Sequence, residues 1–507
     1  MDCTPRQTTV AATVTLYENF LEEKCESDLL IPDYYPAAEK IIQCSADPVI
    51  IKKEVDGDRL DIEGICRFSV IYQGEEEGTI KALHENVPFR ESLPMKEHGQ
   101  APWVQVIMRA GATSCRLLNP RKISVKTNVS LALKVKDQHQ TQTIEKVECA
   151  GVEALFQKAM VYTVLEHPTD TTKVQGEIEV HNAILDILKT EGSVCVKSIR
   201  ILPGKAMIKG VLNLFVLYTA ENAPDRIEST STAIPFSQVL DLKQNEERGE
   251  MEASISIQTI RADLESDEGG KNCLISISAT LLTEGEVYEN QAHSLLIDAY
   301  SNQYPLEFSK EKVQLEELCE RAENTDTLHH KIPMDTEGVE LIQVLGCPVI
   351  QKISGRDKAL TMEGTLDVAL FFREGEQHRS TEKSLSFTLS TALHQLDGQM
   401  RCEMRPYILG MSGSVGADGI DLKTDIGYSM ITFARKNYEM IRELSVDAEH
   451  PLETEEKAPL VIYYAEKGER LWDIARRYAT SVSALKALNE LADDILAEKK
   501  LLLISQS

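Results

Sequence analysis

The sequence predicts a mainly β protein, with three repeated antiparallel β-sandwich-like domains followed by a small βααβ domain. Three observations predict this fold class. Apolar residues spaced by two recur in three similar copies along the 507-residue chain, and Gly, Pro and acidic residues break each copy into short segments. The segment from Leu460 onward changes to a partly helical pattern. A chain of this length exceeds what one hydrophobic core usually serves, so several domains are expected.

The repeated unit centres on three glycines, Gly64, Gly210 and Gly364. In each copy, apolar residues lie two positions before the glycine and two, four, six and eight positions after it. This spacing places them on one face of a β-strand that is turned towards a core. The glycine lies on the same face, where a missing side chain permits a β-bulge or the close approach of a neighbouring element. A second apolar marker follows a polar turn in each copy: Pro88-Phe89, Pro235-Phe236 and Ser386-Phe387.

The register of the copies sets the expected domain limits. Residues 1–29 are expected to be an N-terminal lead-in, and the repeats are expected over 30–165, 174–305 and 332–445. Short helical pieces are expected before the copies, for example over 183–188, and Met411–Ser414 is expected to be a loop. Residues 446–459 are acidic, contain Pro451 and Pro459 and are poor in apolar side chains, which is typical of a linker.

The segment 460–507 predicts two strands that enclose two helices. Residues 461–464 are expected to form the first strand and residues 500–504 the closing strand. Ser481 is a candidate N-cap for the second helix, which ends near Asn489. The apolar residues of the first helix share one face, and they are Leu471, Ile474, Ala475 and Tyr478. Those of the second helix are Val482, Leu485 and Leu488.

Charge and composition exclude several classes of function. The chain has 54 basic and 81 acidic side chains, a net charge of −27, which would repel nucleic acid and anionic membrane surfaces. Residues 460–507 carry seven acids and seven bases, so the excess negative charge belongs to the repeats. No apolar run is long enough to span a bilayer. The eleven cysteines are dispersed, and the N-terminus lacks a secretory signal pattern, so an intracellular, reducing location is expected.

The sequence offers no catalytic or metal-binding constellation. It has no phosphate-binding loop and no Gly-x-Ser-x-Gly elbow. His329 and His330 have no acidic or cysteine companions at metal-ligand spacing, so a solvated pair in a linker is expected. We therefore expect no enzyme activity, no cofactor and no metal. A hydrolase site hidden in the repeats is the remaining alternative, and three similar copies argue against it.

The C-terminal segment resembles a LysM domain. The matching residues are Gly468, Leu471, Trp472, Ile474, Ala475, Tyr478, Leu485, Leu488 and Asn489. Two loops depart from the usual pattern: Glu469-Arg470 replaces Asp-Thr, and Ala497-Glu498-Lys499 replaces Pro-Gly-Gln. The resemblance implies a binding site between these loops, made by Lys467, Gly468, Glu469, Arg470, Trp472, Asn489, Ala497, Glu498 and Lys499. Because the replacements add bulk and charge, a protein ligand is expected in place of a glycan, with Trp472 either a core residue or a contact.

Three copies, an acidic linker and a LysM-like end together resemble the SipL-type spore morphogenetic proteins, which are built from SPOCS domains. The resemblance implies a non-enzymatic scaffold in the mother-cell cytoplasm, at the outer surface of the forespore, that helps attach or encase the spore coat. It also implies that the LysM end docks the morphogenetic ATPase of the coat basement layer, with other coat proteins as further partners. The alternative is a protein that binds peptidoglycan, of the cortex or the cell wall, through the LysM groove.

Overall fold

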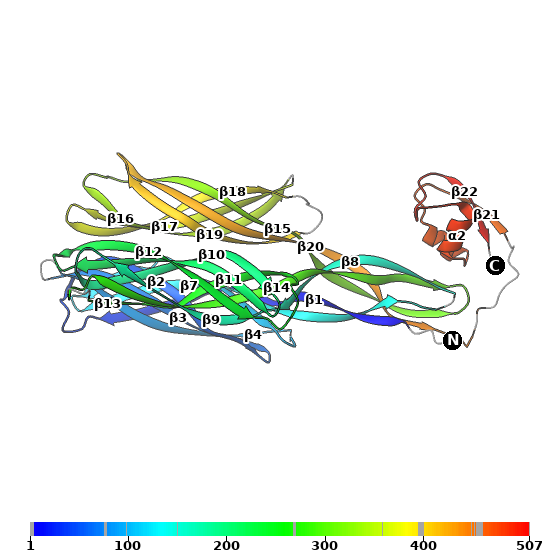
Figure 1. The fold of residues 1–507 in the computed structure, drawn as a ribbon, viewed down its shortest axis with the longest axis horizontal. Coiled ribbons are helices and arrows are strands. Elements are labelled where there is room, and N and C mark those ends of the chain that lie inside the picture. Colours follow the sequence, from blue (N-terminus) through cyan, green and yellow to red (C-terminus); the bar gives the residue numbers. More distant parts are fainter. Residues whose placement is uncertain are drawn as a thin grey trace.

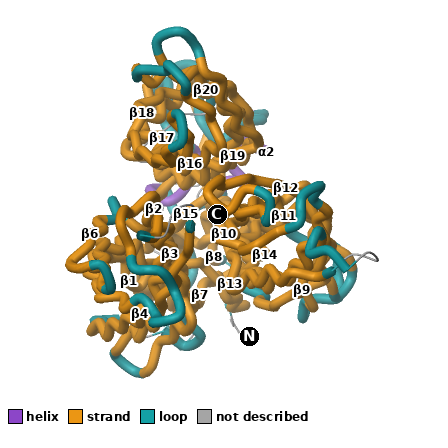
Figure 2. The backbone as a smooth tube through the Cα atoms, turned by 90° about the vertical axis from the view of Figure 1, so that its left-hand side faces the viewer, coloured by secondary structure: helices purple, strands orange, loops and turns teal. Residues whose placement is uncertain are grey.

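The chain folds into three β-sandwiches and one small C-terminal module, as a computed structural model shows (Figure 1). The structure describes residues 5–75, 79–97, 99–149, 151–266, 270–356, 358–393, 400–447, 449–450, 452 and 460–505. Viewed down the long axis of the molecule, three lobes surround a common centre, and each lobe is one sandwich (Figure 2). The predicted fold class, mainly β with repeated antiparallel sandwiches, is confirmed.

The first sandwich consists of two antiparallel sheets. One sheet has the order β1-β7-β5, with β6 also paired to β7, and the other is the meander β2-β3-β4. The strands are β1 (Arg6–Leu30), β2 (Ala38–Asp56), β3 (Arg59–Gly74), β4 (Ile80–Pro94), β5 (Trp103–Ala110), β6 (Ser114–Asn119) and β7 (Lys122–Lys146).

The second sandwich repeats this plan with its first strand divided in two. Its meander is β10-β11-β12, and its other sheet has the order β13-β14-β8, with β9 also paired to β14. The strands are β8 (Val152–Glu166), β9 (Thr169–Glu179), β10 (Ile184–Leu202), β11 (Lys205–Ala220), β12 (Ala223–Asp241), β13 (Glu250–Glu265) and β14 (Leu274–Ser301).

The third sandwich pairs the meander β16-β17-β18 with the sheet β15-β20-β19. In all three sandwiches, therefore, the first strand pairs with the long last strand, and the meander lies between them in sequence. The strands are β15 (Leu306–Pro333), β16 (Val339–Arg356), β17 (Ala359–Glu374), β18 (Gln377–Ala392), β19 (Met400–Val415) and β20 (Gly419–Val446).

This pairing moves the limits of the units away from those expected. β1 pairs with β7 from Arg6 to Leu30, so the segment expected as a lead-in at 1–29 is mostly the first strand of a sandwich. Sheet pairing places the units at 6–146, 152–301 and 306–446, where the sequence suggested 30–165, 174–305 and 332–445. The first strand was missed because it precedes the glycine pattern, and its partner strand comes only after the meander.

A β-bulge explains the helix that was wrongly expected over 183–188. These residues begin β10, and the register shifts between Ile187 and Lys189, which leaves Leu188 without a partner across the strand pair. Ile187 packs on the core of its own sandwich, whereas Leu188 packs between sandwiches. The register also shifts between Ile184 and Asp186, so Ile184 and Ile187 face the same core although they are three residues apart, and this spacing imitates a helix.

Two segments expected as loop or linker are strands. Met411–Ser414 lies within β19, paired to β20. His329 and His330 lie within β15 and pair with Lys423 and Leu422 of β20. His330 Nε2 lies 3.1 Å from the carbonyl oxygen of Ser386, so this histidine belongs to the body of the third sandwich.

Each repeated glycine lies opposite a phenylalanine of the next strand. The pairs are Gly64–Phe89, Gly210–Phe236 and Gly364–Phe387. A Cβ on Gly64 would lie 2.2 Å from Cζ of Phe89, so the ring occupies the space that a side chain would need. The preceding strand has a register shift beside each glycine. Of the two expected reasons for a glycine, a bulge or a close approach, the structure shows the close approach of the phenylalanine ring, with a register shift beside it.

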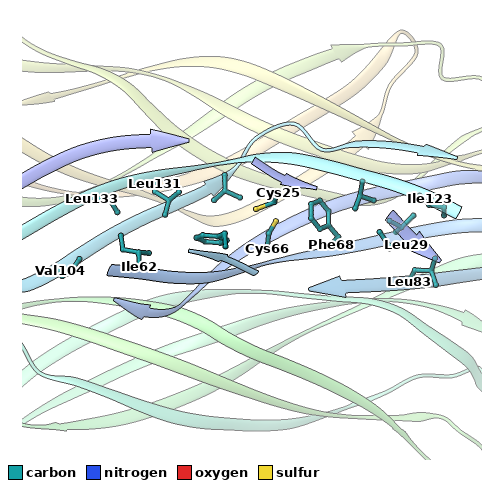
Figure 3. Close-up of a cluster of buried hydrophobic side chains, with 14 of the residues drawn as sticks. Cys25, Leu29, Ile62, Cys66, Phe68, Leu83, Val104, Ile123, Leu131 and Leu133 are labelled. Atoms are coloured by element: carbon teal, nitrogen blue, oxygen red, sulfur yellow. The ribbon is translucent and has the colours of Figure 1, made fainter. Parts of the chain in front are cut away.

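The core of the first sandwich lies between the faces of β3 and β7. Ile62, Cys66 and Phe68 of β3 are buried, as their spacing predicted, and they share a cluster with Leu131 and Leu133 of β7 (Figure 3). Cys66 thus behaves as a small apolar residue. Of the ten described cysteines, nine are free thiols and Cys149 is disulfide-bonded.

The three meanders contact one another in a closed ring. The third strand of each meander lies against the first strand of the next: β4 on β10, β12 on β16, and β18 on β2. Lys81 of β4 forms an ion pair with Asp186 of β10 at 3.0 Å. At the other two contacts a serine hydroxyl donates to a backbone carbonyl, Ser229 to Ile342 at 3.3 Å and Ser380 to Ile42 at 3.0 Å.

An apolar cluster fills the centre of this ring, with one polar exception. It joins equivalent residues of the three meanders: Ile42, Ile71, Ile80, Leu188, Leu217, Ile227 and Phe371. By register, the third-meander equivalent of Ile80 and Ile227 is His378, which is also buried. His378 Nε2 accepts a hydrogen bond from the amide of Ile227 at 3.1 Å. Burial and the nearby Arg373 lower the pKa of His378 to about 4.

We expect this histidine to make the ring sensitive to acid. An unfolded histidine has a pKa near 6.5, so between about pH 6.5 and 4 the unfolded state binds more protons and stability falls as the pH falls. The loss from His378 is roughly 2–3 kcal/mol, since one pKa unit corresponds to about 1.4 kcal/mol. The pKa of His378 also depends on other nearby charges, those of Asp225, Arg226 and Glu340. Denaturant unfolding at pH 4.5 and 7 should show this loss for the wild type and for the exposed-site control His139→Gln. The loss should be smaller by that amount for His378→Gln, which keeps an acceptor but does not titrate, while His84 and His293, whose pKa values burial also lowers, still contribute. An unchanged loss would contradict the assignment.

The other sheets of the three sandwiches meet in a buried ionic network. Lys136 of β7 contacts Glu286 of β14 at 3.1 Å, and both side chains are largely buried. Trp103 Nε1 donates to the same carboxylate at 2.6 Å. Lys134 of β7 reaches Glu403 of β19 at 3.1 Å. The network therefore links all three units through their other sheets.

Candidate binding site on the C-terminal module

The C-terminal module has the expected βααβ order. β21 (Leu460–Ala465) pairs with β22 (Lys500–Ser505), and α1 (Leu471–Arg477) and α2 (Val482–Asn489) lie between them in sequence. The predicted helix face is buried at Leu471, Ile474 and Ala475. Ser481 is the N-cap of α2, as expected, and its hydroxyl accepts from the amide of Ala484 at 3.0 Å. Leu488 differs from the expectation, because it is 43% exposed.

The two loops that the sequence singled out lie side by side. The amide of Gly468 donates to Leu496 O at 2.8 Å, and the amide of Leu496 donates to Glu469 O at 3.0 Å. Arg470 and Ile495 form an isolated antiparallel bridge. Backbone hydrogen bonds thus join the loops 466–470 and 494–499 into one surface. Gly468 has φ +88°, in the left-handed region that disfavours other residues.

Charged side chains cover this loop surface in short-range pairs. Arg470 makes a two-pronged contact to Asp473, at 2.8 and 3.0 Å. Lys499 contacts Glu466 at 2.6 Å, and both are well exposed. Lys467, Ala497 and Glu498 are exposed as well. The site is therefore a charged, hydrated surface of alternating sign.

Glu469 braces the first loop from within the module. Its carboxylate accepts from the hydroxyl of Tyr463 at 2.9 Å and from the amide of Glu466 at 3.0 Å. This hydrogen bond raises the pKa of Tyr463. Glu469 was expected as a ligand contact, and its carboxylate is already engaged in these internal bonds.

Asn489 holds the module together and lies apart from the loops. Its side-chain amide donates to Leu485 O at 2.9 Å and to Leu503 O at 2.7 Å, and its Oδ1 accepts from the amide of Leu503 at 2.6 Å. These bonds tie the end of α2 to β22. Both the amide nitrogen and the amide oxygen of Asn489 therefore make hydrogen bonds within the module, which gives this residue a structural role.

Trp472 also lies away from the loops and faces the second sandwich. Its indole packs on Tyr300 of β14 in an edge-on arrangement with ring centroids 4.8 Å apart. Nε1 donates to Asp298 at 3.0 Å. Trp472 is 7% exposed and belongs to the apolar cluster of the LysM core, and its contacts with Asp298 and Tyr300 lie within the chain. No sequence pattern marks Asp298 and Tyr300 as contacts of Trp472, because they lie in a different domain.

A second surface of the module is apolar and exposed. Leu460, Ile462 and Tyr464 alternate along the outer face of β21, next to Leu501 of β22, and each is at least 43% exposed. The sequence analysis did not separate these residues from the core, because the first strand is apolar on both faces. The module therefore offers a charged loop surface and an apolar sheet face.

The described residues add no other chemistry to the site. They contain no group of three or more His, Cys, Asp or Glu side chains arranged to hold a metal ion. Neither helix in the described ranges has the length and apolar character needed to cross a membrane.

Comparison with protein families identifies two kinds of domain. The model of the SipL, SPOCS domain family matches residues 37–108 and 183–265, and the LysM domain model matches residues 463–504. None of the curated proteins and none of the solved structures matches the chain. The SPOCS matches cover β2–β5 of the first unit and β10–β13 of the second, that is, the meander and the strand that follows it. The resemblance to a SipL-type combination of SPOCS and LysM domains is thus confirmed.

Proposed function

We propose that this chain, with its SipL-type SPOCS domains and a LysM domain, is a non-enzymatic scaffold of the spore envelope. SPOCS and LysM families are non-catalytic, and the SipL family is associated with sporulation. The finer proposal is that the protein acts from the mother-cell cytoplasm, at the outer surface of the forespore, where it helps attach or encase the coat. The third unit, which shares the strand order of the other two, acts as a further SPOCS-like domain.

We further propose that the LysM domain binds protein, with the morphogenetic ATPase of the coat basement layer as its partner. The observation that carries this proposal is the loop surface. Arg470, Glu498 and Lys499 place exposed charged side chains where LysM glycan sites carry small residues. Charged pairs of alternating sign suit a complementary protein surface, whereas a neutral amino sugar offers no counter-charge.

The test is the affinity of the full chain for the purified basement-layer ATPase, measured by calorimetry. Lys499→Glu reverses one charge of the exposed Lys499–Glu466 pair and should weaken binding roughly tenfold. Lys331→Glu makes the same change in the exposed Lys331–Asp418 pair of the third sandwich, and should leave the affinity unchanged. Absence of any binding by the wild-type chain, or equal effects of both variants, would refute the proposed docking surface.

Peptidoglycan binding is the second candidate function. It is favoured by the LysM match itself and by the loop backbone, where Gly468 keeps the left-handed conformation that brings the two loops together. This candidate predicts binding that is insensitive to Lys499→Glu and lost when the Gly468 backbone is distorted by Gly468→Val.

A further inference from the structure

We propose that Asp298 acts as a latch that holds the LysM domain on the tip of the second unit. In this arrangement, the aromatic face of the LysM domain serves an internal contact, and only its loops and its outer sheet face remain available to partners. The inference goes beyond the proposed function and is independent of which ligand the LysM domain binds.

The latch is built from two donors on one carboxylate oxygen. Trp472 Nε1 lies 3.0 Å from Asp298 Oδ2, and Arg476 Nη1 lies 2.8 Å from the same atom. Both donors come from α1, one turn apart, so a single acidic residue fixes the helix in position and in rotation. The Asp298 side chain is 16% exposed, which shields this charged contact from solvent.

Packing around the carboxylate closes the contact. Tyr300 is 7% exposed and belongs to the same apolar cluster as the LysM core residues, with Leu155 of β8 packed against it. The Tyr300 hydroxyl donates to Thr480 O at 2.7 Å, in the turn between α1 and α2. Glu153 of β8 accepts a hydrogen bond from the amide of Val482 at the start of α2. The LysM core therefore continues into the body of the protein.

The geometry leaves two LysM surfaces free. The contact uses α1, the turn after it and the start of α2, whereas the loops 466–470 and 494–499 make no part of it. In Figure 1, β21 lies on the side of the domain away from the three sandwiches. A ligand that needed Trp472 would first have to displace Asp298 and Tyr300.

One oxygen of the Asp298 carboxylate accepts both hydrogen bonds from the LysM domain. Asp298 Oδ1 is buried and has no hydrogen-bond partner among the residues that the structure describes, so both donors depend on Oδ2. Loss of the carboxylate would leave the indole N–H of Trp472 without a partner in an apolar contact, which favours separation of the two surfaces.

Hydrogen exchange of the full chain, followed by mass spectrometry, tests the latch. In Asp298→Ala, peptides that contain the Val482 amide should exchange at least about tenfold faster than in the wild type. Peptides that report on the LysM interior, through the amides of Leu471 and Tyr478, should keep their protection. Asp418→Ala, which removes an exposed carboxylate of the third sandwich, is the matched control and should change neither.

A second variant tests the other donor of the latch, Arg476. Arg476→Gln removes one donor and keeps Trp472, so its exchange at Val482 should lie between those of the wild type and Asp298→Ala. Unchanged exchange at Val482 in both variants would overturn the latch. Loss of protection at Leu471 and Tyr478 in Asp298→Ala would overturn it as well, because the contact would then be part of the folding core of the domain and not a docking contact.

Discussion

Gly364→Ala should destabilise the third unit by about 3 kcal/mol, at the upper end of what overpacking costs. A Cβ at this position would lie 2.3 Å from the carbonyl oxygen of Val349 and 2.7 Å from the ring of Phe387. The carbonyl belongs to the backbone beside a β-bulge and cannot move without breaking the pairing of β16 with β17. Denaturant unfolding of the full chain, followed by hydrogen exchange of β16–β18 peptides, measures the effect.

Gly64 provides the matched control, because the three atoms nearest to a Cβ there all belong to the ring of Phe89. Gly64→Ala should also destabilise its unit, but Phe89→Leu in the same chain should recover most of the loss. The corresponding pair, Gly364→Ala with Phe387→Leu, should recover little, since the carbonyl of Val349 remains in place. Equal recovery in the two units would show that the backbone contact at Gly364 does not limit the space.

Lys136→Met should loosen the contact between the first and second units by about 3–5 kcal/mol, the usual cost of removing one partner of a buried ion pair. The Lys136 side chain is 5% exposed and that of Glu286 is 13% exposed, so Glu286 would keep a buried charge that the neutral donors Trp103 and Gln105 still contact. The loss should appear as a lower unfolding midpoint in guanidinium chloride. The exposed-pair control, Lys331→Met, should cost no more than about 0.5 kcal/mol.

The effect of Lys136→Met on stability should also depend on pH, because Lys136 acts on a second carboxyl group of the network, that of Glu403. Burial opposes the ionisation of Glu403, but Lys136, Arg401 and Lys134 outweigh it and hold the pKa of this carboxyl at about 2. A carboxyl with a lowered pKa stabilises the fold above its unfolded pKa near 4.5, and this stability is lost as the pH falls towards 2. Lys136→Met should raise the pH at which acid unfolding begins. An unchanged acid transition would mean that Lys136 does not support the ionised form of Glu403.

The strands that face a core could be predicted from the sequence, whereas the assembly of the units could not. Ile62, Cys66 and Phe68 alternate with polar residues, and this period of two fixes which face is buried. Contacts between units depend on outward-facing residues such as Leu188, whose apolar cluster includes residues of the other units. His378 takes the position that isoleucine occupies in the other two units, so no repeated pattern marks it.

The candidate site was predicted in its parts but not in its surroundings. The βααβ order, the N-cap at Ser481 and the charged loops follow from local sequence. The roles of Asn489 and Trp472 do not follow from local sequence. Asn489 depends on Leu503 and Trp472 on Asp298, and both partners lie farther away in the chain. Sheet pairing gives domain limits that differ from the expected ones for the same reason, since β1 pairs with β7, which follows the meander in the sequence.

We propose above all that the LysM domain binds protein and does not bind glycan in the groove between its loops. Calorimetric titration of the full chain with a chitin-type oligosaccharide tests this claim most directly. We expect no saturable binding at micromolar concentration, because Arg470, Glu498 and Lys499 occupy the rims of the loop surface and Trp472 is held by Asp298. Saturable micromolar binding that is lost in Gly468→Val, and retained in Lys499→Glu, would contradict the account.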